Sequence, residues 1–369
     1  MKLLKMHLAK PTFLIDKGKS IVKIEKMLKK SQRQGLIFRP HFKTHQSKEV
    51  GGWFREVGVQ AITVSSFEMA EFFASDGWSD ITVAFSVNPN EVETIKCLSG
   101  KVNLNVVLED ISVVDQLDSK LDSPIGVYIE INTGYHRAGL NPRDIDLITP
   151  LIQRLDKSHN FDFRGFLTFA GHSYHARSEK EILRVHSEYM EDMLGLKKEY
   201  ISSNPMLELS IGDTPTCSIA EDFNGIGEMR PGNFIFYDLM QVIIGSCTRD
   251  QVSAIVACPV VAIHKDRGEI IIFGGAVHFS KEAINTKERG DYHGDVVMLQ
   301  DGAWSCEETG AYLSWVTQEH GIVKAPESFI NRIKIGDFIG VIPVHSCLTA
   351  NLMKKSTLIL NSENEAIEE

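Results

Sequence analysis

The sequence predicts an α/β protein in which a (β/α)8 TIM barrel is joined to a mostly β carboxyl-terminal domain. Eight short apolar runs alternate with amphipathic segments of helical spacing over about 220 residues. Strands that alternate with helices imply a parallel sheet, and eight such units suggest a closed barrel. Beyond Gly245 the long helical periods stop, and short strand patterns alternate with turns rich in Gly, Asp and Asn. An open doubly wound sheet is the alternative, but the Gly-x-Gly-x-x-Gly turn that would favour it does not follow the first strand.

In chain order, a short strand pattern at Thr12–Ile15 precedes a helical pattern that ends at Gly35. The expected barrel strands are Leu36–Phe42, Ala61–Val64, Ile81–Phe85, Val102–Leu108, Ile125–Ile131, Phe163–Phe169, Leu207–Ile211 and Gly227–Arg230. The expected strands of the second domain are Val252–Ile263, Glu269–Phe273, Asp295–Leu299, Ala311–Thr317 and Asp337–Pro343. We therefore expect a barrel over residues 17–245 and a discontinuous β domain of residues 1–16 and 246–369.

Charge and composition narrow the classes of partner. The net charge is -10 and the chain lacks a long basic block, which argues against nucleic acid or a membrane surface and favours a small-molecule substrate. The six cysteines form no Cys-x-x-Cys pair, and residues 1–10 lack the apolar region of a secretory signal. No apolar run approaches the roughly 20 residues that span a bilayer. A cytoplasmic protein with reduced thiols is the expectation.

Polar side chains follow the expected strand ends, where a barrel places its active site. Lys43 lies among other cations in the run Arg39-Pro-His-Phe-Lys43-Thr-His45, directly after an apolar stretch. Desolvation and like charge both make an amine lose its proton easily, as an imine-forming lysine must. A solvated basic loop is the ordinary alternative. The other rim segments are Asn132–Gly139, Gly171–His175, Ser210–Thr216 and Arg230–Asn233.

Glycine and threonine in the loops after the seventh and eighth strands are suited to binding a phosphate through backbone N–H and hydroxyl groups. Gly212 and Gly232 could equally be turn residues. A phosphate opposite an imine-forming lysine, with Arg137 and His172 at the same rim, indicates pyridoxal 5'-phosphate (PLP).

The run Arg39–His45 resembles the cofactor-lysine motif of the fold-type III PLP enzymes in the D-threonine aldolase and eukaryotic-type D-serine dehydratase group. The similarity extends through most of the rim segments to the far carboxyl terminus. It implies an alanine-racemase-like barrel plus a β domain, a homodimer, and Lys43 as the Schiff-base lysine. It further implies Arg137 near the phenolic oxygen of the cofactor and His172 against its ring. The remaining cofactor-binding residues that it implies are Tyr174 and, around the phosphate, Ser210, Gly212, Thr214, Gly232 and Asn233.

Two residues depart from that family's pattern. Asn132 stands where the family often has Asp, and Gln46 stands where it often has Lys. In addition, Ser210–Cys217 contains no arginine, whereas alanine racemase places one near there to hold the pyridine nitrogen unprotonated. Racemisation is therefore the less favoured reaction of this fold.

His345 and Cys347 form the second candidate site. On a strand, residues i and i+2 share a face, so an imidazole and a thiolate could converge on one ion, and nitrogen with sulfur suits Zn2+. Two packing residues are the ordinary alternative. The resemblance implies the His-x-Cys zinc pair of D-serine dehydratases rather than the His-x-Asp pair of D-threonine aldolases. His278 and His293 flank a glycine-rich loop and receive no role.

The sequence thus predicts a PLP- and Zn2+-dependent ammonia-lyase that resembles D-serine dehydratase and converts a D-3-hydroxy amino acid to a 2-oxo acid and ammonia. Lys43 would take the α-proton, and the metal would assist departure of the β-hydroxyl group. The first alternative is a D-threonine aldolase-type C–C lyase that gives glycine and an aldehyde. An amino acid racemase or a non-enzymatic PLP-binding barrel is a further alternative, but the latter would lack the β domain of about 120 residues.

Overall fold

The computed structural model describes residues 8–300, 303–361 and 366–368. Most of the amino-terminal segment considered above for a secretory signal, residues 1–7, lies outside this range. The chain forms two compact units. We call residues 25–43 and 48–232 the barrel unit, and residues 1–24, 44–47 and 233–369 the β unit.

The barrel unit contains a parallel sheet whose eight strands follow the order β2-β9-β8-β7-β6-β5-β4-β3. The strands are β2 (Ile37–Phe38), β3 (Ile62–Val64), β4 (Asp80–Ser86), β5 (Asn103–Leu108), β6 (Ile125–Ile131), β7 (Phe161–Thr168), β8 (Glu208–Ile211) and β9 (Glu228–Met229). Each expected barrel strand is therefore confirmed, although β2 and β9 are only two residues long. The predicted (β/α)8 architecture is confirmed with them.

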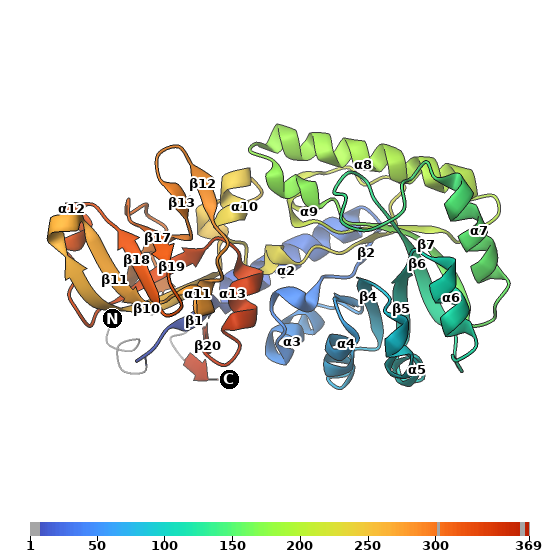
Figure 1. The fold of residues 1–369 in the computed structure, drawn as a ribbon, viewed down its shortest axis with the longest axis horizontal. Helices are drawn as coiled ribbons and strands as arrows, with labels where there is room; N and C mark the ends of the chain where they lie inside the picture. The colour runs from blue at the N-terminus through green and yellow to red at the C-terminus, as the bar shows by residue number, and fades with distance from the viewer. Residues whose placement is uncertain (1–7, 301–302, 362–365, 369) are drawn as a thin grey trace. The chain divides into compact units, whose positions relative to one another are not determined.

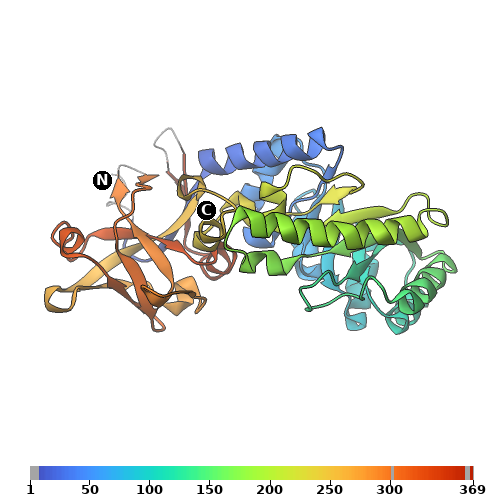
Figure 2. The same ribbon diagram turned by 90° about the horizontal axis from the view of Figure 1, so that it is seen from above.

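Helices surround these strands on the outside, as Figures 1 and 2 show for α4 to α8. Their apolar faces pack on the strands, and residues of the central strands such as Val106, Val127 and Ile129 are completely buried. The helices up to the last barrel strand are α2 (Lys17–Arg33), α3 (Lys48–Glu56), α4 (Phe67–Ala74), α5 (Val92–Ser99), α6 (Ile111–Asp118), α7 (Ile145–Asp156), α8 (Glu179–Tyr200) and α9 (Thr214–Ile219).

Backbone and side-chain contacts join β2 to β3, where the sheet is nearly closed. A parallel bridge connects His41 with Thr63, and the Thr63 amide donates to the Pro40 carbonyl at 2.9 Å. The Thr63 hydroxyl also donates to the Arg39 carbonyl at 2.9 Å. The guanidinium of Arg39 then reaches Asp80 at the start of β4, with Nη1 at 2.5 Å from Oδ1. The two ends of the sheet are thus tied by a short run of polar contacts.

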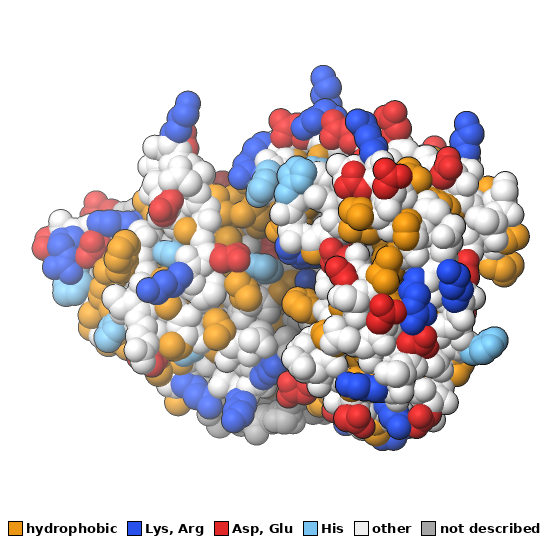
Figure 3. All heavy atoms as spheres, turned by 45° about the vertical axis from the view of Figure 1, so that its right-hand side comes forward, with side chains coloured by type: hydrophobic (Ala, Val, Ile, Leu, Met, Phe, Trp, Pro, Cys, Tyr) orange, Lys and Arg blue, Asp and Glu red, His pale blue; other side chains and the backbone are white. Residues whose placement is uncertain are grey.

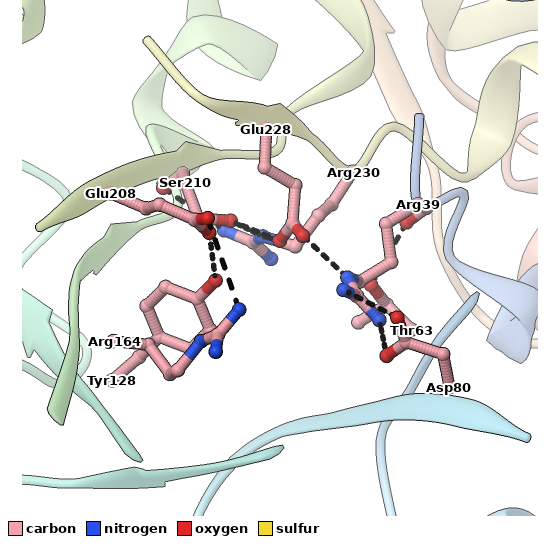
Figure 4. Close-up of polar contacts among 9 residues, drawn as sticks. All are labelled: Arg39, Thr63, Asp80, Tyr128, Arg164, Glu208, Ser210, Glu228 and Arg230. Carbon is pink, nitrogen blue, oxygen red and sulfur yellow. Dashed lines mark hydrogen bonds and ion pairs between the residues drawn. The ribbon is translucent and has the colours of Figure 1, made fainter. Parts of the chain in front are cut away.

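Further polar side chains inside the barrel extend this contact across the strands (Figure 4). Arg39 Nε donates to Glu228 Oε2 at 2.5 Å, and Glu228 Oε1 accepts the Ser210 hydroxyl at 2.7 Å. Arg230 donates to Ser210 Oγ at 2.5 Å and to the Thr168 carbonyl at 2.8 Å. Because each buried charge has hydrogen-bonding partners, the barrel tolerates polar residues next to the rim.

The β unit is built on a nine-stranded sheet in the order β11-β18-β17-β14-β19-β10-β1-β20-β21, with β11 also paired to β10. The first strand of the chain, β1, pairs antiparallel with β10 and parallel with β20. The strands of the sheet are β1 (Thr12–Asp16), β10 (Ala254–His264), β11 (Glu269–Phe273), β14 (Gly294–Val297), β17 (Tyr312–Val316), β18 (His320–Lys324), β19 (Phe338–Pro343), β20 (Thr357–Leu360) and β21 (Ala366–Glu368). The remaining elements are the hairpin strands β12 (Ile284–Thr286), β13 (Gly290–Tyr292), β15 (Leu299–Gln300) and β16 (Ala303–Trp304), and the helices α10 (Leu239–Ile244), α11 (Ala276–Phe279), α12 (Glu327–Ile330) and α13 (Ser346–Leu352).

Acidic and basic side chains are interspersed over the face drawn in Figure 3. All six cysteines are free thiols. Within the described ranges, every helix is too short or too polar to cross a membrane.

Candidate active site

Lys43 lies in a short 3-10 turn, Phe42–Thr44, which follows β2 after the three residues Arg39 to His41. Its Nζ is 5.7 Å from the centroid of the Phe169 ring, and Phe169 follows the end of β7. The guanidinium carbon of Arg137 lies 4.9 Å from the centroid of the same ring. The centroid of the Tyr174 ring lies 6.3 Å from that of Phe169. The structure therefore gathers three predicted site residues, Lys43, Arg137 and Tyr174, around one phenylalanine.

His172 lies beside the loop that carries Arg137. A Cβ atom on Gly134 would come within 3.4 Å of the His172 ring, and Gly134 has φ +114°, so this close approach of loop and ring favours glycine. Burial lowers the pKa of His172, which keeps its ring neutral near pH 7. Its Nδ1 is buried and has no hydrogen-bond partner within the described chain.

Arg137 also faces a carboxylate. Its Nη2 lies 3.7 Å from Glu130 Oε1, and Glu130, on β6, is buried. Burial raises the pKa of Glu130, and the nearby charge of Glu109 raises it further. Arg137 itself is about half exposed, so its guanidinium is accessible to a ligand.

The residues predicted around the phosphate differ in whether their hydrogen-bonding groups already have partners within the protein. Thr214 begins α9, and its buried hydroxyl has no hydrogen-bond partner among the described residues. Gly232 follows β9 and is half-buried. The Ser210 hydroxyl, in contrast, is engaged by Glu228 and Arg230. Of the predicted phosphate residues, all of which the structure describes, Thr214 is thus the one whose side-chain donor is unused.

The close approach of the Arg230 side chain, rather than a turn, favours glycine at position 212. A Cβ atom there would lie 2.9 Å from the Cβ of Arg230 and 3.0 Å from its Nη1. The segment Ser210–Cys217 contains no arginine, but Arg230 brings a guanidinium to it from the loop after β9. The argument against racemisation from the missing arginine is weakened accordingly.

These residues fit PLP. A lysine amine and an arginine lie over one aromatic ring, a neutral imidazole has an unused nitrogen, and a buried threonine hydroxyl has no partner within the described chain. A phosphorylated aromatic aldehyde needs an amine to bond, a flat wall and hydroxyl donors for its phosphate.

His345 and Cys347 lie together in the β unit, but the prediction that they share a strand is wrong. Strand β19 ends at Pro343, and His345 is the amino-terminal capping residue of α13, with Cys347 in its first turn. The apolar run of β19 extends to Val344, but the backbone turns into a helix directly after that residue. The two side chains still meet, because the imidazole and the thiol are hydrogen-bonded to each other.

Cys347 is held by two further polar side chains. Its thiol donates to Thr44 Oγ1 at 3.3 Å, and Asn233 Nδ2 lies 3.5 Å from Sγ. Asn233 also donates to Asp238 at 2.6 Å, and the Asp238 carboxylate accepts the Ser346 amide at 2.9 Å. The structure thus places the Asn233 side chain, predicted at the phosphate, against the cysteine of the candidate metal pair.

His345 and Cys347 influence each other's protonation. Burial raises the pKa of the Cys347 thiol, but the hydrogen bonds to His345 and Thr44 and the charge of His345 together outweigh it, and the pKa is lowered. Burial lowers the pKa of His345, whereas hydrogen bonds to Cys347 and Glu282 raise it to about 11. The thiol is therefore poised to become a thiolate, which is the form that binds metal.

This pair fits a metal with open positions. Across the described residues, no cluster of three or more His, Cys, Asp and Glu side chains has the arrangement of a metal site. One imidazole nitrogen and one sulfur would be the protein ligands, and nitrogen with sulfur suits Zn2+. Two protein ligands leave positions for water and substrate.

A parallel (β/α)8 barrel with a lysine just past its first strand, joined to a β unit, is the architecture of the fold-type III PLP enzymes. The family model "Alanine racemase, N-terminal domain" matches residues 24–239, and the chain belongs to this family. The model "Putative serine dehydratase domain" matches residues 253–359.

Curated relatives match over nearly their full length. A D-serine dehydratase of Dictyostelium discoideum is 28% identical and covers 93% of this chain and 91% of its own. A D-threo-3-hydroxyaspartate dehydratase of Delftia sp. is 27% identical over 92% of this chain and 91% of its own. The solved structure of the latter has a TM-score of 0.90 at 26% identity and covers 98% and 97% of the two chains.

Two other solved structures add detail. One is a cysteine-to-alanine variant of a D-threo-3-hydroxyaspartate dehydratase in a metal-free form, with a TM-score of 0.90 at 26% identity and coverage of 98% and 97%. The other is D-threonine aldolase from Filomicrobium marinum, with a TM-score of 0.83, 16% identity and coverage of 98% and 96%, which is a likeness of fold alone.

Several residues of the site carried too little sequence signal to be singled out. Phe169 ends an expected strand, and its aromatic ring could have been counted among the rim residues. Thr44 lies inside the lysine motif, where a buried hydroxyl is not distinguishable from a solvated one. Glu282, which contacts His345 at 2.7 Å, lies 63 residues away from it in the chain, and no spacing rule connects the two.

Proposed function

We propose that this chain is a PLP- and metal-dependent ammonia-lyase that eliminates the β-hydroxyl group from a D-3-hydroxy amino acid, giving a 2-oxo acid and ammonia. The observation that carries the proposal is the pairing of His345 with Cys347 in the β unit of a chain whose barrel unit gathers Lys43 and Arg137 around the ring of Phe169. The dehydratase names of the similar proteins support it.

The barrel residues would hold the cofactor and move the proton. Lys43 would bond the cofactor aldehyde through its amine, and Thr214 would donate its unused hydroxyl to the phosphate. After the substrate amine displaces Lys43, the free lysine amine would take the α-proton as general base. When bound, PLP supplies an electron sink for the carbanion.

Arg137 and His172 would orient the cofactor. The half-exposed guanidinium of Arg137 can donate to an anionic oxygen on the ring, and its contact with Phe169 fixes its position. The ring of His172 is neutral and braced by Gly134, so it can pack on an aromatic cofactor without adding charge.

The hydroxide leaving group explains why a metal site is useful. Hydroxide is a poor leaving group, and a divalent metal on His345 and Cys347 would supply a Lewis acid for it. A cysteine ligand favours Zn2+ over the harder ions that a carboxylate would select. In the elimination itself, water leaves from Cα and Cβ, and the resulting enamine tautomerises and hydrolyses to the 2-oxo acid and ammonia.

One substrate screen tests this proposal. The protein, reconstituted with PLP and Zn2+, would be given D-serine, D-threonine and D-threo-3-hydroxyaspartate, and 2-oxo acid, ammonia, aldehyde and L-isomer would be measured. We expect 2-oxo acid and ammonia in equal amounts, with activity lost on EDTA treatment and restored by Zn2+. Glycine plus an aldehyde would indicate an aldolase, an L-isomer would indicate a racemase, and full activity after chelation would refute the metal-dependent elimination.

A further inference from the structure

Glu282 contacts the candidate metal ligand His345 at one defined nitrogen. Its Oε2 lies 2.7 Å from His345 Nδ1. A carboxylate can only accept a hydrogen bond, so Nδ1 carries a proton, and in the neutral imidazole that binds a metal the lone pair is then on Nε2. Histidine ligands in metal sites commonly donate their other N–H to a carboxylate in this way, which fixes the tautomer and orients the ring.

The backbone of Glu282 is held on both sides. Its amide donates to Ser280 Oγ at 3.1 Å, and its carbonyl accepts from Nδ1 of His293 at 2.9 Å. Ser280 has φ +68° and ψ -172°, a conformation that is costly for a residue other than glycine. The loop is therefore fixed by specific contacts, although the Glu282 side chain is about half exposed.

His293 connects Glu282 to the strand end that precedes His345. The His293 carbonyl accepts the Val344 amide at 3.3 Å, and the adjacent Gly294 pairs with Pro343 in the sheet. His293 is itself buried. The contacts thus form a closed ring that runs from His293 to Glu282, on to His345 and back through Val344.

We propose that Glu282 is a positioning residue for metal binding, and that it fixes the tautomer and orientation of His345 so that Nε2 and the sulfur of Cys347 face one ion. This inference rests on the proposed function, because it presupposes a metal on these two ligands. His293 supports it by holding the Glu282 backbone.

A simpler interpretation is a surface ion pair between Glu282 and His345. Such pairs contribute little to stability, and both side chains are partly exposed. Stability therefore does not separate the two interpretations, whereas metal affinity does, because an ordinary surface pair has no effect on a metal ion.

The test measures metal affinity on the PLP-loaded protein after removal of metal with a chelator. Co2+ would be titrated in competition with a chromophoric chelator, and the absorption band of the cobalt–thiolate bond would report ligation. The variants are Glu282→Ala and Glu282→Gln, with Glu288→Ala as the matched control. Glu288 is an exposed glutamate in the loop between β12 and β13 of the same unit.

We expect Glu282→Ala to weaken Co2+ binding by about 10- to 100-fold. Glu282→Gln keeps an oxygen that accepts from Nδ1 and should fall between Ala and the unchanged protein. Glu288→Ala should bind Co2+ normally, and the visible absorption of PLP should be the same in every variant. This graded order is not expected from a residue with only a structural role.

The outcomes separate the inference from the function on which it rests. Unchanged Co2+ affinity in a folded Glu282→Ala variant would overturn the positioning role alone. If that variant does not fold, as circular dichroism would show, a Glu282→Gln variant with unchanged affinity would overturn it instead. If the unaltered protein binds no Co2+ through a thiolate, the metal-dependent function fails first.

Discussion

The thiol of Cys347 donates a hydrogen bond to Thr44 Oγ1 at 3.3 Å, and Thr44 directly follows Lys43 in the chain. Thr44 is almost completely buried, so the contact is shielded from water. The cysteine of the candidate metal pair is thereby bonded to the residue next to the candidate cofactor lysine, although 303 residues separate the two bonded partners. A metal on Cys347 would therefore depend on the placement of Thr44.

Replacement of the Thr44 hydroxyl should lower metal affinity and leave the binding of PLP intact. In Thr44→Val the volume is nearly kept and the hydrogen bond is lost, so we expect metal affinity to fall by about 10-fold, as for other residues that support a metal ligand. Thr44→Ser keeps the hydroxyl and should bind normally. Metal titration with retained PLP absorbance measures the effect. Equal affinity in the Val and Ser variants would show that the hydroxyl is unimportant.

Lys43 should be the lysine that bonds PLP. Lys43→Ala removes the amine, so the visible absorption of bound PLP should disappear. Loss of the general base alone should lower turnover by about 100- to 10,000-fold. Lys48→Ala is the matched control, because Lys48 begins α3 five residues later and its amine contacts the Ser75 hydroxyl at 3.0 Å. A normal PLP spectrum in Lys43→Ala would place the cofactor bond on another residue.

The barrel could be predicted from the sequence because its strands are buried on both faces. Runs such as Ile125–Ile131, in which every residue is buried, stand out from the amphipathic helices between them. The sequence predicts the ends of β2 and β9 less accurately, because Arg39 and Glu228 are polar residues that are buried in the core. Their burial depends on partners from distant strands, and no local pattern reports that.

In the candidate site too, local sequence predicts some residues, and others depend on contacts between distant segments. Lys43 was identifiable because chemistry and strand position agree within one short segment. The i, i+2 spacing of His345 and Cys347 predicts a shared strand face, but the two residues lie at the turn from β19 into α13, and nothing in the apolar run before them marks where the strand ends. Glu282 is not predictable from the sequence, because its contact with His345 forms only when the sheet of the β unit is assembled.

The buried pair of Arg39 and Glu228 should stabilise the barrel unit. Both side chains are at most 3% exposed, and Glu228→Gln would leave Arg39 facing a neutral amide. Breaking a buried ion pair from one side costs about 3–5 kcal/mol, and we expect the lower end because Asp80 still pairs with Arg39. Urea unfolding measures the change in free energy of unfolding.

Glu208→Gln is the control for that experiment. Glu208, which Figure 4 draws with Tyr128 and Arg164, accepts the Tyr128 hydroxyl at 3.0 Å and is 28% exposed. Because Glu208 and its other partner Arg164 are both partly exposed, the loss of this charge should cost about 1 kcal/mol or less. Equal losses in both variants would mean that burial of the Arg39–Glu228 pair adds nothing to its effect.

His186 should make the stability of the barrel unit fall in mild acid. It packs edge-on against the rings of Tyr189 and Phe223, and its buried Nε2 lacks a hydrogen-bond partner within the described chain. Burial lowers the pKa of His186 to about 4, whereas an unfolded histidine titrates near 6.5. Between these values the unfolded chain binds more protons, so the contribution of His186 is complete above about pH 6.5 and is lost as the pH falls toward 4. We expect urea unfolding of the unaltered protein to show a loss of unfolding free energy over this range that is about 1–3 kcal/mol larger than in His186→Phe, since one pKa unit corresponds to about 1.4 kcal/mol.

The control is His159→Phe, which replaces an exposed histidine and should leave the pH dependence of the unfolding free energy unchanged. Parallel curves for His186→Phe and the unaltered protein would contradict the prediction.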